Sequence, residues 1–335
     1  MKKLVRGLLD TRRSVTAAMA AAVFAALTAG FSAPAAAQGA YPTKPIRMIV
    51  GFAPGGAADV ITRVIAQALG TQLGQQVIVD NRPGAEAVIA AQATAQSPPD
   101  GYTLMFGSNT ALVAVPTRPN PPYDPFKTFT PISSAGQFSM FLAVNGALPV
   151  RNVNELLAYA KANEGKLNSA SSNSAAELAM VQLMAPSKAK WLNIRYKGDV
   201  PALVDLAAGQ INMIFTTGTS APAFVKDGRA KVLLTLQPER SPLLPDVPSA
   251  AELGLTNLTI LPWAGFFGPA DMPPEITEKL SAAFQKVLAS KEVKDQLIQQ
   301  GFEGYGMSPQ AFSAFFRKAY DSWVDTIREN NIKFE

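Results

Sequence analysis

The 335-residue chain contains no cysteine and no histidine. Without cysteine it forms no disulfide and offers no thiol for a lipoprotein anchor. Without histidine, Ser-His-Asp and Cys-His nucleophile systems, His-bearing zinc sites and the commonest general base are excluded. Carboxylate, lysine and tyrosine chemistry stays open. We expect no catalytic residues, no metal and no cofactor.

The first 37 residues have the pattern of a cleavable secretory signal peptide. An uncharged, alanine-rich run covers residues 15–31, and Ala35 and Ala37 supply the small residues of an A-x-A cleavage site. A transmembrane anchor is the alternative, but a span needs about 20 apolar residues and alanine is only weakly apolar. We therefore expect a periplasmic protein. The pair Arg12-Arg13 leaves Sec and twin-arginine export both open.

The leader also carries most of the net positive charge of the chain. The whole chain has 30 Lys and Arg against 25 Asp and Glu. Residues 1–37 hold five of the basic residues and one acidic residue, which leaves 25 against 24 in the remainder. A nucleic-acid-binding domain keeps a basic excess in its folded part. Nucleic acid is therefore not an expected partner.

After the leader, strands and helices alternate. Apolar, β-branched runs predict strands at 46–50, 77–79 and 102–106, and helical spacing predicts helices at 58–73 and 87–95. This βαβαβ order predicts a parallel sheet with right-handed crossovers. The proline-rich stretch 113–131 is interpreted as an extended surface segment.

A second strand–helix series follows, and then a helical tail. The pattern predicts strands at 139–144, 167–171, 191–195, 211–215 and 231–236, and helices at 152–163, 174–185 and 199–208. One strand ending at Phe267 precedes helices near 274–289, 291–300 and 308–330. These tail helices have no sheet of their own, so they must pack on an earlier domain.

The predicted fold is an α/β, two-lobed periplasmic-binding-protein fold that closes by hinge motion, each lobe being a mostly parallel sheet flanked by helices. About 298 residues after the leader exceed the usual size of a single core. Lobe 1 comprises 41–140 plus 262–335, and lobe 2 comprises 141–261. Two sequential domains are the alternative that the pattern alone leaves open.

Polar or glycine-rich loops follow two strands of the first lobe, at the sheet edge where ligands bind. The first loop contains Phe52, Ala53, Pro54, Gly55, Gly56 and Asp59, and the second contains Ser108 and Asn109. Glycines permit close backbone approach, and a helix start favours an anion. A tight turn and ordinary helix caps are the alternatives. The first loop is not G-x-G-x-x-G, so a dinucleotide site is weakly supported.

The second lobe has similar strand exits. Ser171, Ser172, Asn173 and Ser174 follow one predicted strand, and Thr216 and Thr217 follow another. Together these loops predict a neutral, donor-rich pocket. Tyr196 and Lys197 are further candidates, with a simple turn as the alternative.

Eight short motifs, in register along the chain, resemble the Bug-type receptors of the tripartite tricarboxylate transporter family. They are Tyr41-Pro-Thr-Lys-Pro-Ile-Arg47, Phe52-Ala-Pro-Gly-Gly-Ala-Ala-Asp59, Asn81-Arg-Pro-Gly-Ala85, Pro99-Asp-Gly-Tyr-Thr103, Tyr123-Asp-Pro125, Gly165-Lys-Leu167, Tyr196-Lys-Gly198 and Leu244-Pro-Asp-Val-Pro-Ser249. The resemblance implies a monomeric receptor that is not an enzyme. It implies a ligand carboxylate held by the 52–59 loop, selectivity set by second-lobe loops, and delivery of an organic acid to membrane permease subunits.

The chain departs from the family pattern inside the implied site. Glu86 and Ala87 stand where the family has two glycines, Glu177 stands in place of a histidine, and Thr216 in place of an aspartate. A buried glutamate needs an arginine, a proton or a ligand amine, because an unpaired buried charge is costly. We therefore favour a monocarboxylate, an aromatic acid or an amide over a citrate-like ligand. Two functions compete with transport. One is a sensor that serves a membrane signalling protein. The other is a hydrolase or lyase that uses carboxylates or Tyr196 and Lys197.

Overall fold

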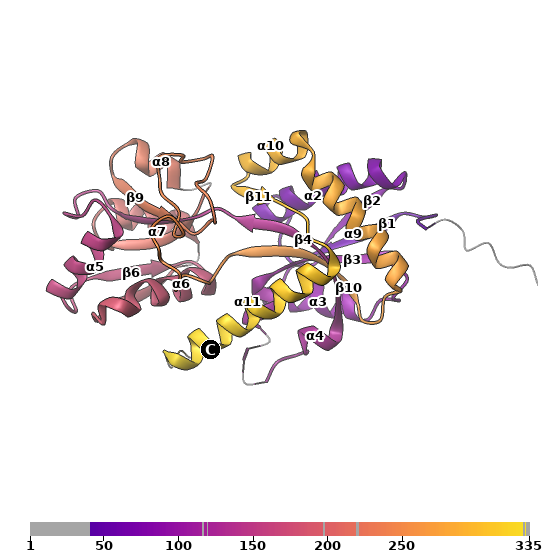
Figure 1. Cartoon of the computed structure of the whole chain (residues 1–335), viewed down its shortest axis with the longest axis horizontal. Helices are drawn as coiled ribbons and strands as arrows, with labels where there is room; N and C mark the ends of the chain where they lie inside the picture. Colours follow the sequence, from indigo (N-terminus) through magenta and orange to yellow (C-terminus); the bar gives the residue numbers. More distant parts are fainter. Residues whose placement is uncertain are drawn as a thin grey trace, which may run out of the picture. The chain divides into compact units, whose positions relative to one another are not determined.

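The computed structural model describes residues 41–115, 117–118, 120–196, 198–218, 221–330 and 332. Helices and strands alternate along most of this length (Figure 1). The described strands form two sheets, one of six strands in the order β11-β4-β10-β3-β1-β2 and one of five in the order β7-β6-β8-β5-β9. The predicted α/β class with two sheets is confirmed.

The six-stranded sheet combines the N-terminal strands with the tail of the chain. Its strands are β1 (Ile46–Val50), β2 (Val77–Asn81), β3 (Thr103–Ser108), β4 (Phe129–Phe138), β10 (Trp263–Pro269) and β11 (Phe302–Gly304). Its helices are α2 (Ala57–Leu73), α3 (Val88–Ala95), α4 (Pro125–Thr128), α9 (Pro274–Ala289), α10 (Lys291–Gln299) and α11 (Pro309–Glu329), with a 3-10 turn at Ala85–Ala87 and a π-helical turn at Thr110–Ala114.

The five-stranded sheet is built from the middle of the chain. Its strands are β5 (Met140–Asn145), β6 (Asn168–Ser171), β7 (Leu192–Arg195), β8 (Met213–Thr217) and β9 (Ala230–Thr235). Its helices are α5 (Val153–Ala162), α6 (Ser174–Met184), α7 (Asp199–Ala207) and α8 (Ala221–Lys226), with a 3-10 turn at Ala185–Ser187. The exact lobe boundaries given above stay a prediction.

Both sheets are mixed rather than mostly parallel. Strand β1 pairs in parallel with β2 and β3, and β6 pairs in parallel with β7 and β8. The strands β4, β5, β10 and β11 pair antiparallel to their neighbours, as do β8 and β9 with β5. Parallel pairing needs a long crossover connection. Strand β4 of the six-stranded sheet instead leads into β5 of the five-stranded sheet through a single residue, Ser139.

The interpretation of 113–131 as an extended surface segment is wrong over its second half. Tyr123 is buried, and its hydroxyl donates to the carbonyl of Ala111 at 2.7 Å. Pro125 occupies the first position of α4, where a missing N–H costs nothing. Strand β4 begins directly after it. The prolines in this half of the segment therefore occur at the start of a helix and near the start of a strand.

The core of the six-stranded sheet is aromatic on both faces. The ring of Phe266 in β10 stacks on Phe284 of α9 with centroids 3.8 Å apart, while Trp263 contacts Phe312 and Phe316 of α11. Residues of one strand alternate between faces, so α9 and α11 cover opposite sides. Within the described residues, no helix combines the length and apolarity that crossing a membrane requires.

Candidate functional site

The loop from β1 to α2 ends in a helix start with no side-chain cap. Gly56 is the N-cap residue and no side chain accepts a bond there. Residues 53–56 are exposed, and Gly55 has φ +80°, a left-handed conformation that favours glycine. The first N–H groups of a helix have no intrahelical partner. This turn can therefore receive an anion through its backbone.

Asp59 stabilises this loop through hydrogen bonds. Its buried carboxylate accepts from the Gly55 N–H at 2.9 Å, from the guanidinium of Arg63 at 3.0 Å and from the amide of Asn81 at 2.8 Å. Burial acts to raise the pKa of Asp59, but these bonds outweigh it and lower the pKa to about 2. The predicted ligand-binding carboxylate is thus ionised and already hydrogen-bonded by the protein.

Three consecutive left-handed residues precede α3. Ala85, Glu86 and Ala87 have φ of 46°, 54° and 68°, a region that strains residues with a Cβ. This turn directs the side chain of Glu86 to Arg118, with an N–O distance of 2.7 Å. A Cβ at Gly51 would overlap the Cβ of Ala87, so the two segments approach closely.

Two polar atoms on this side are buried without a hydrogen-bond partner in the described part of the chain. They are the Oγ of Ser108, at the end of β3, and the Nε of Arg118. Strands β1 and β3 are parallel neighbours, so Ser108 and the 51–56 loop lie at the same sheet edge. Asn109 is buried beside Ser108.

The loop from β6 to α6 divides its polar groups between structure and cavity. Ser171 is buried, and its Oγ accepts from Asn193 at 2.9 Å. Asn173 caps α6 by accepting from the Ala176 N–H at 2.9 Å. Ser172 instead donates to Asp199. Part of the hydroxyl-rich sequence therefore serves the sheet and the helix cap.

Asp199 also accepts hydrogen bonds from the last two residues of β8. Its carboxylate accepts from the Thr216 hydroxyl at 3.0 Å, from the Thr217 N–H at 2.7 Å and from the Thr217 hydroxyl at 2.6 Å. With Ser172, three of the predicted ligand-binding residues therefore bond to an aspartate that the sequence analysis did not select. Thr216 is fully buried.

A small polar cavity of about 130 Å³ joins residues that both sheets contribute. It is lined by Glu86, Arg118, Ser171, Ser172, Asn173, Ser174, Glu177, Arg195 and Tyr196. The Glu177 carboxylate accepts twice from Arg195, at 3.0 and 3.2 Å. Both glutamates at the implied site therefore have an arginine partner.

The cavity brings together five of the predicted site residues, namely Glu86 and Ser171–Ser174. The 52–59 loop, Ser108, Asn109, Thr216 and Thr217 are not among its lining residues. The sequence analysis missed Arg118 and Arg195. Arg118 lies in the proline-rich stretch and Arg195 ends a strand, and only tertiary contacts reveal their pairing with glutamates.

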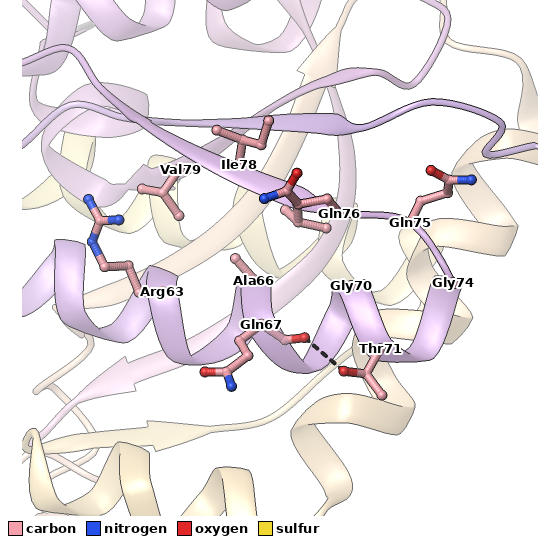
Figure 2. Close-up of a pocket in the computed structure, with 11 residues that line it drawn as sticks. Arg63, Ala66, Gln67, Gly70, Thr71, Gly74, Gln75, Gln76, Ile78 and Val79 are labelled. Carbon is pink, nitrogen blue, oxygen red and sulfur yellow. Dashed lines mark hydrogen bonds between the residues drawn. The ribbon is translucent and has the colours of Figure 1, made fainter.

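A wider groove, of about 680 Å³, lies between α2 and β2 (Figure 2). Figure 2 shows Gln67 and Thr71 on the helix and Gln75 and Gln76 on the connection that leads to the strand. The groove opens beside an edge strand and has few charged groups. The smaller cavity is the candidate site, because its lining comes from segments that belong to both sheets.

Tyr196 is held in its protonated form. Its hydroxyl donates to Asp205 at 2.6 Å, and this bond, with burial and the nearby charge, raises the pKa of Tyr196 to about 12. Lys197 lies outside the described residues. Tyr196 is therefore a poor general base at neutral pH.

Comparison with known proteins shows the family to which this chain is similar. Residues 61–332 match the family described as tripartite tricarboxylate transporter family receptor. BugT of Bordetella pertussis is 34% identical over 314 residues, which cover 92% of this chain and 95% of BugT.

Solved structures of similar fold include several binding proteins. The periplasmic binding protein BugD has 28% identity and a TM-score of 0.69, with 88% of this chain and 100% of BugD covered. A Rhodopseudomonas palustris protein with adipate has 28% identity and a TM-score of 0.71 (86% and 97% covered). MatC from the same organism, with bound malate, has 28% identity and a TM-score of 0.67 (86% and 100% covered).

The two-sheet fold and these similarities define a solute-binding protein of the two-lobed periplasmic class. More narrowly, the chain belongs to the tripartite tricarboxylate transporter receptor family, the Bug or TctC receptors.

Proposed function

We propose that the protein is exported to the periplasm and captures a small carboxylate-bearing ligand, or a related amide or aromatic acid, between two lobes. It delivers this ligand unchanged, as a monomer, to the permease subunits of a tripartite tricarboxylate-type transporter. The lobes are residues 41–140 plus 262–335 and residues 141–261. The observation that carries the proposal is the cavity lined from both sheets, with guanidinium groups from Arg118 and Arg195.

The donors around the cavity suit a carboxylate. The cavity-lining Arg118 has a buried Nε with no partner in the described structure. Outside the cavity lining, at the edge of the six-stranded sheet, the Oγ of Ser108 is also unpartnered and the start of α2 lacks a side-chain cap. Charge-assisted bonds from arginine are the strong way to hold a carboxylate. The family relatives solved with adipate and with malate support the same ligand class.

Binding without turnover fits the titratable groups at the cavity. Glu86 and Glu177 are each paired with an arginine, and the raised pKa of Tyr196 keeps its phenol protonated. Acid–base catalysis needs groups free to gain and lose a proton near the working pH.

A thermal-shift screen of the purified protein against mono- and dicarboxylates, aromatic acids and amides tests the proposal. A ligand present at a hundredfold excess over its Kd should stabilise the protein by about 2.7 kcal/mol. An absence of any shift across the panel, together with chemical conversion of a panel member, would contradict it. The same binding without permease subunits encoded beside the gene favours the sensor alternative.

A further inference from the structure

Building on the proposed function, we propose that Asp199 is a resident carboxylate that sets ligand specificity. It selects against ligands with a second carboxylate and in favour of monocarboxylates whose far end carries a hydrogen-bond donor, such as an amide, a hydroxyl or an ammonium group. The proposal rests on which protons the loops of the five-stranded sheet have available.

Both oxygens of the Asp199 carboxylate accept hydrogen bonds from the protein, four in all. One oxygen accepts from the Ser172 hydroxyl, and the other accepts from the Thr216 hydroxyl and from both the N–H and the hydroxyl of Thr217. A carboxylate offers about four acceptor sites. Asp199 is the first residue of α7, where the helix dipole favours a negative charge. The aspartate therefore needs no cation from the ligand.

The same bonds use three hydroxyl protons of these loops, those of Ser172, Thr216 and Thr217, which could otherwise be donated to a ligand anion. A serine or threonine hydroxyl has one proton and two acceptor lone pairs. Ser172, Thr216 and Thr217 all direct that proton to Asp199. Ser172 lines the cavity and also accepts from the Asn173 amide at 3.2 Å. What remains on these hydroxyl oxygens is acceptor capacity.

The arginines of the cavity do not compensate at this end. Arg195 bonds to Glu177 through two nitrogens, and Arg118 bonds to Glu86 and keeps its unpartnered Nε for the first ligand carboxylate. A second ligand carboxylate next to Ser172 meets the negative charge of Asp199 and receives no proton from the Ser172 hydroxyl. A ligand amide or hydroxyl at the same place donates to the free lone pairs. The loops thus favour a ligand group that donates a hydrogen bond over one that only accepts.

Calorimetric titration with matched ligand pairs tests this inference. The pairs are adipate with its monoamide and malate with its monoamides, so that each pair differs only in one carboxylate. Wild type should bind the amide of at least one pair about tenfold more tightly or better than the diacid. Asp199→Ser should free the hydroxyl protons of Ser172, Thr216 and Thr217 for the ligand. The ratio of amide affinity to diacid affinity should then shrink or reverse.

Two control variants separate this effect from general electrostatics and from misfolding. Asp227→Asn removes one exposed negative charge, after α8, without touching the cavity lining or Ser172, Thr216 and Thr217, and should keep the wild-type ratio. Thr217→Val keeps the charge of Asp199 and should also keep the preference for the amide. Circular dichroism and denaturant unfolding establish that each variant is folded.

The outcomes distinguish the two proposals. Diacids that bind wild type as tightly as their amides overturn the role of Asp199, as does an equal change of ratio in Asp199→Ser and Asp227→Asn. Both results leave carboxylate capture intact. If none of these acids or amides binds, and the wider screen is also negative, the proposed function fails and the inference fails with it.

Discussion

Asp59 stabilises the loop between β1 and α2, and its lowered pKa predicts how that stability depends on pH. Its pKa falls from 3.8 to about 2 on folding, so the stabilisation is present above pH 4 and is lost as pH falls through 2. Asp59→Asn should cost about 2 kcal/mol at pH 7. Urea unfolding between pH 2 and 7 measures this, and a cost that stays constant down to pH 2 would contradict the assignment.

Ala85 offers a second prediction at the scale of one residue. It is exposed with φ +46°, and a left-handed conformation costs a residue with a Cβ roughly 1–2 kcal/mol. Ala85→Gly should therefore stabilise the protein by about 0.5–1 kcal/mol, after the extra chain entropy of glycine is subtracted. Ala53→Gly, in an exposed position where φ is not positive, is the matched control and should not stabilise. Equal unfolding midpoints for the two variants would count against the strain.

Some site residues could be found from the sequence and others could not. The segment 171–174, which lines the cavity, was predicted because polar residues follow predicted strands and parallel strands end at one sheet edge, and Glu86 was predicted because it replaces a glycine of the family pattern. Arg118, Arg195 and Asp199 were missed. Their roles depend on partners 32, 18 and 27 residues away in the chain, and no local pattern encodes such pairings.

At the scale of elements, Gln182 of α6 joins the segment 257–260 to α11. Its amide donates to the hydroxyls of Thr259 and Thr326 at 2.8 and 2.9 Å, and its carbonyl oxygen accepts from the backbone of Thr259 and Ile260. Gln182→Leu leaves buried donors without acceptors and should cost about 2–3 kcal/mol.

Chemical denaturation measures that cost, with Gln296→Leu on the exposed side of α10 as its control. The control should change stability by no more than about 0.5 kcal/mol. Equal effects of the two substitutions would show that Gln182 is not a structural link.

The longer helices were predicted well, whereas the short helices α4 and α8 and two of the strands were not predicted. Helices α5, α6, α9 and α11 begin and end within two residues of their predicted bounds, because apolar spacing repeats over several turns. Strand β4 was missed, since its Ser133-Ser-Ala-Gly136 centre is small and shows no alternation, and it is buried on both sides. Strand β11 has only three residues, too few for any period.

At the scale of the whole molecule, the exported form should begin at Gln38. The basic head, the alanine-rich run and the small residues before Gln38 predict cleavage after Ala37. Intact-mass measurement of the protein from a periplasmic fraction, with N-terminal sequencing, checks this. A chain that retains residues 1–37 and sediments with membranes would instead indicate an anchor.

The central claim is that the molecule binds a carboxylate reversibly and does not transform it. Isothermal titration with the acid that gives the largest thermal shift, followed by recovery of that acid for mass spectrometry, tests it most directly. The account predicts one saturable site per chain and quantitative recovery of unchanged acid. A product of altered mass, or no saturable site for any carboxylate or its amide, would contradict it.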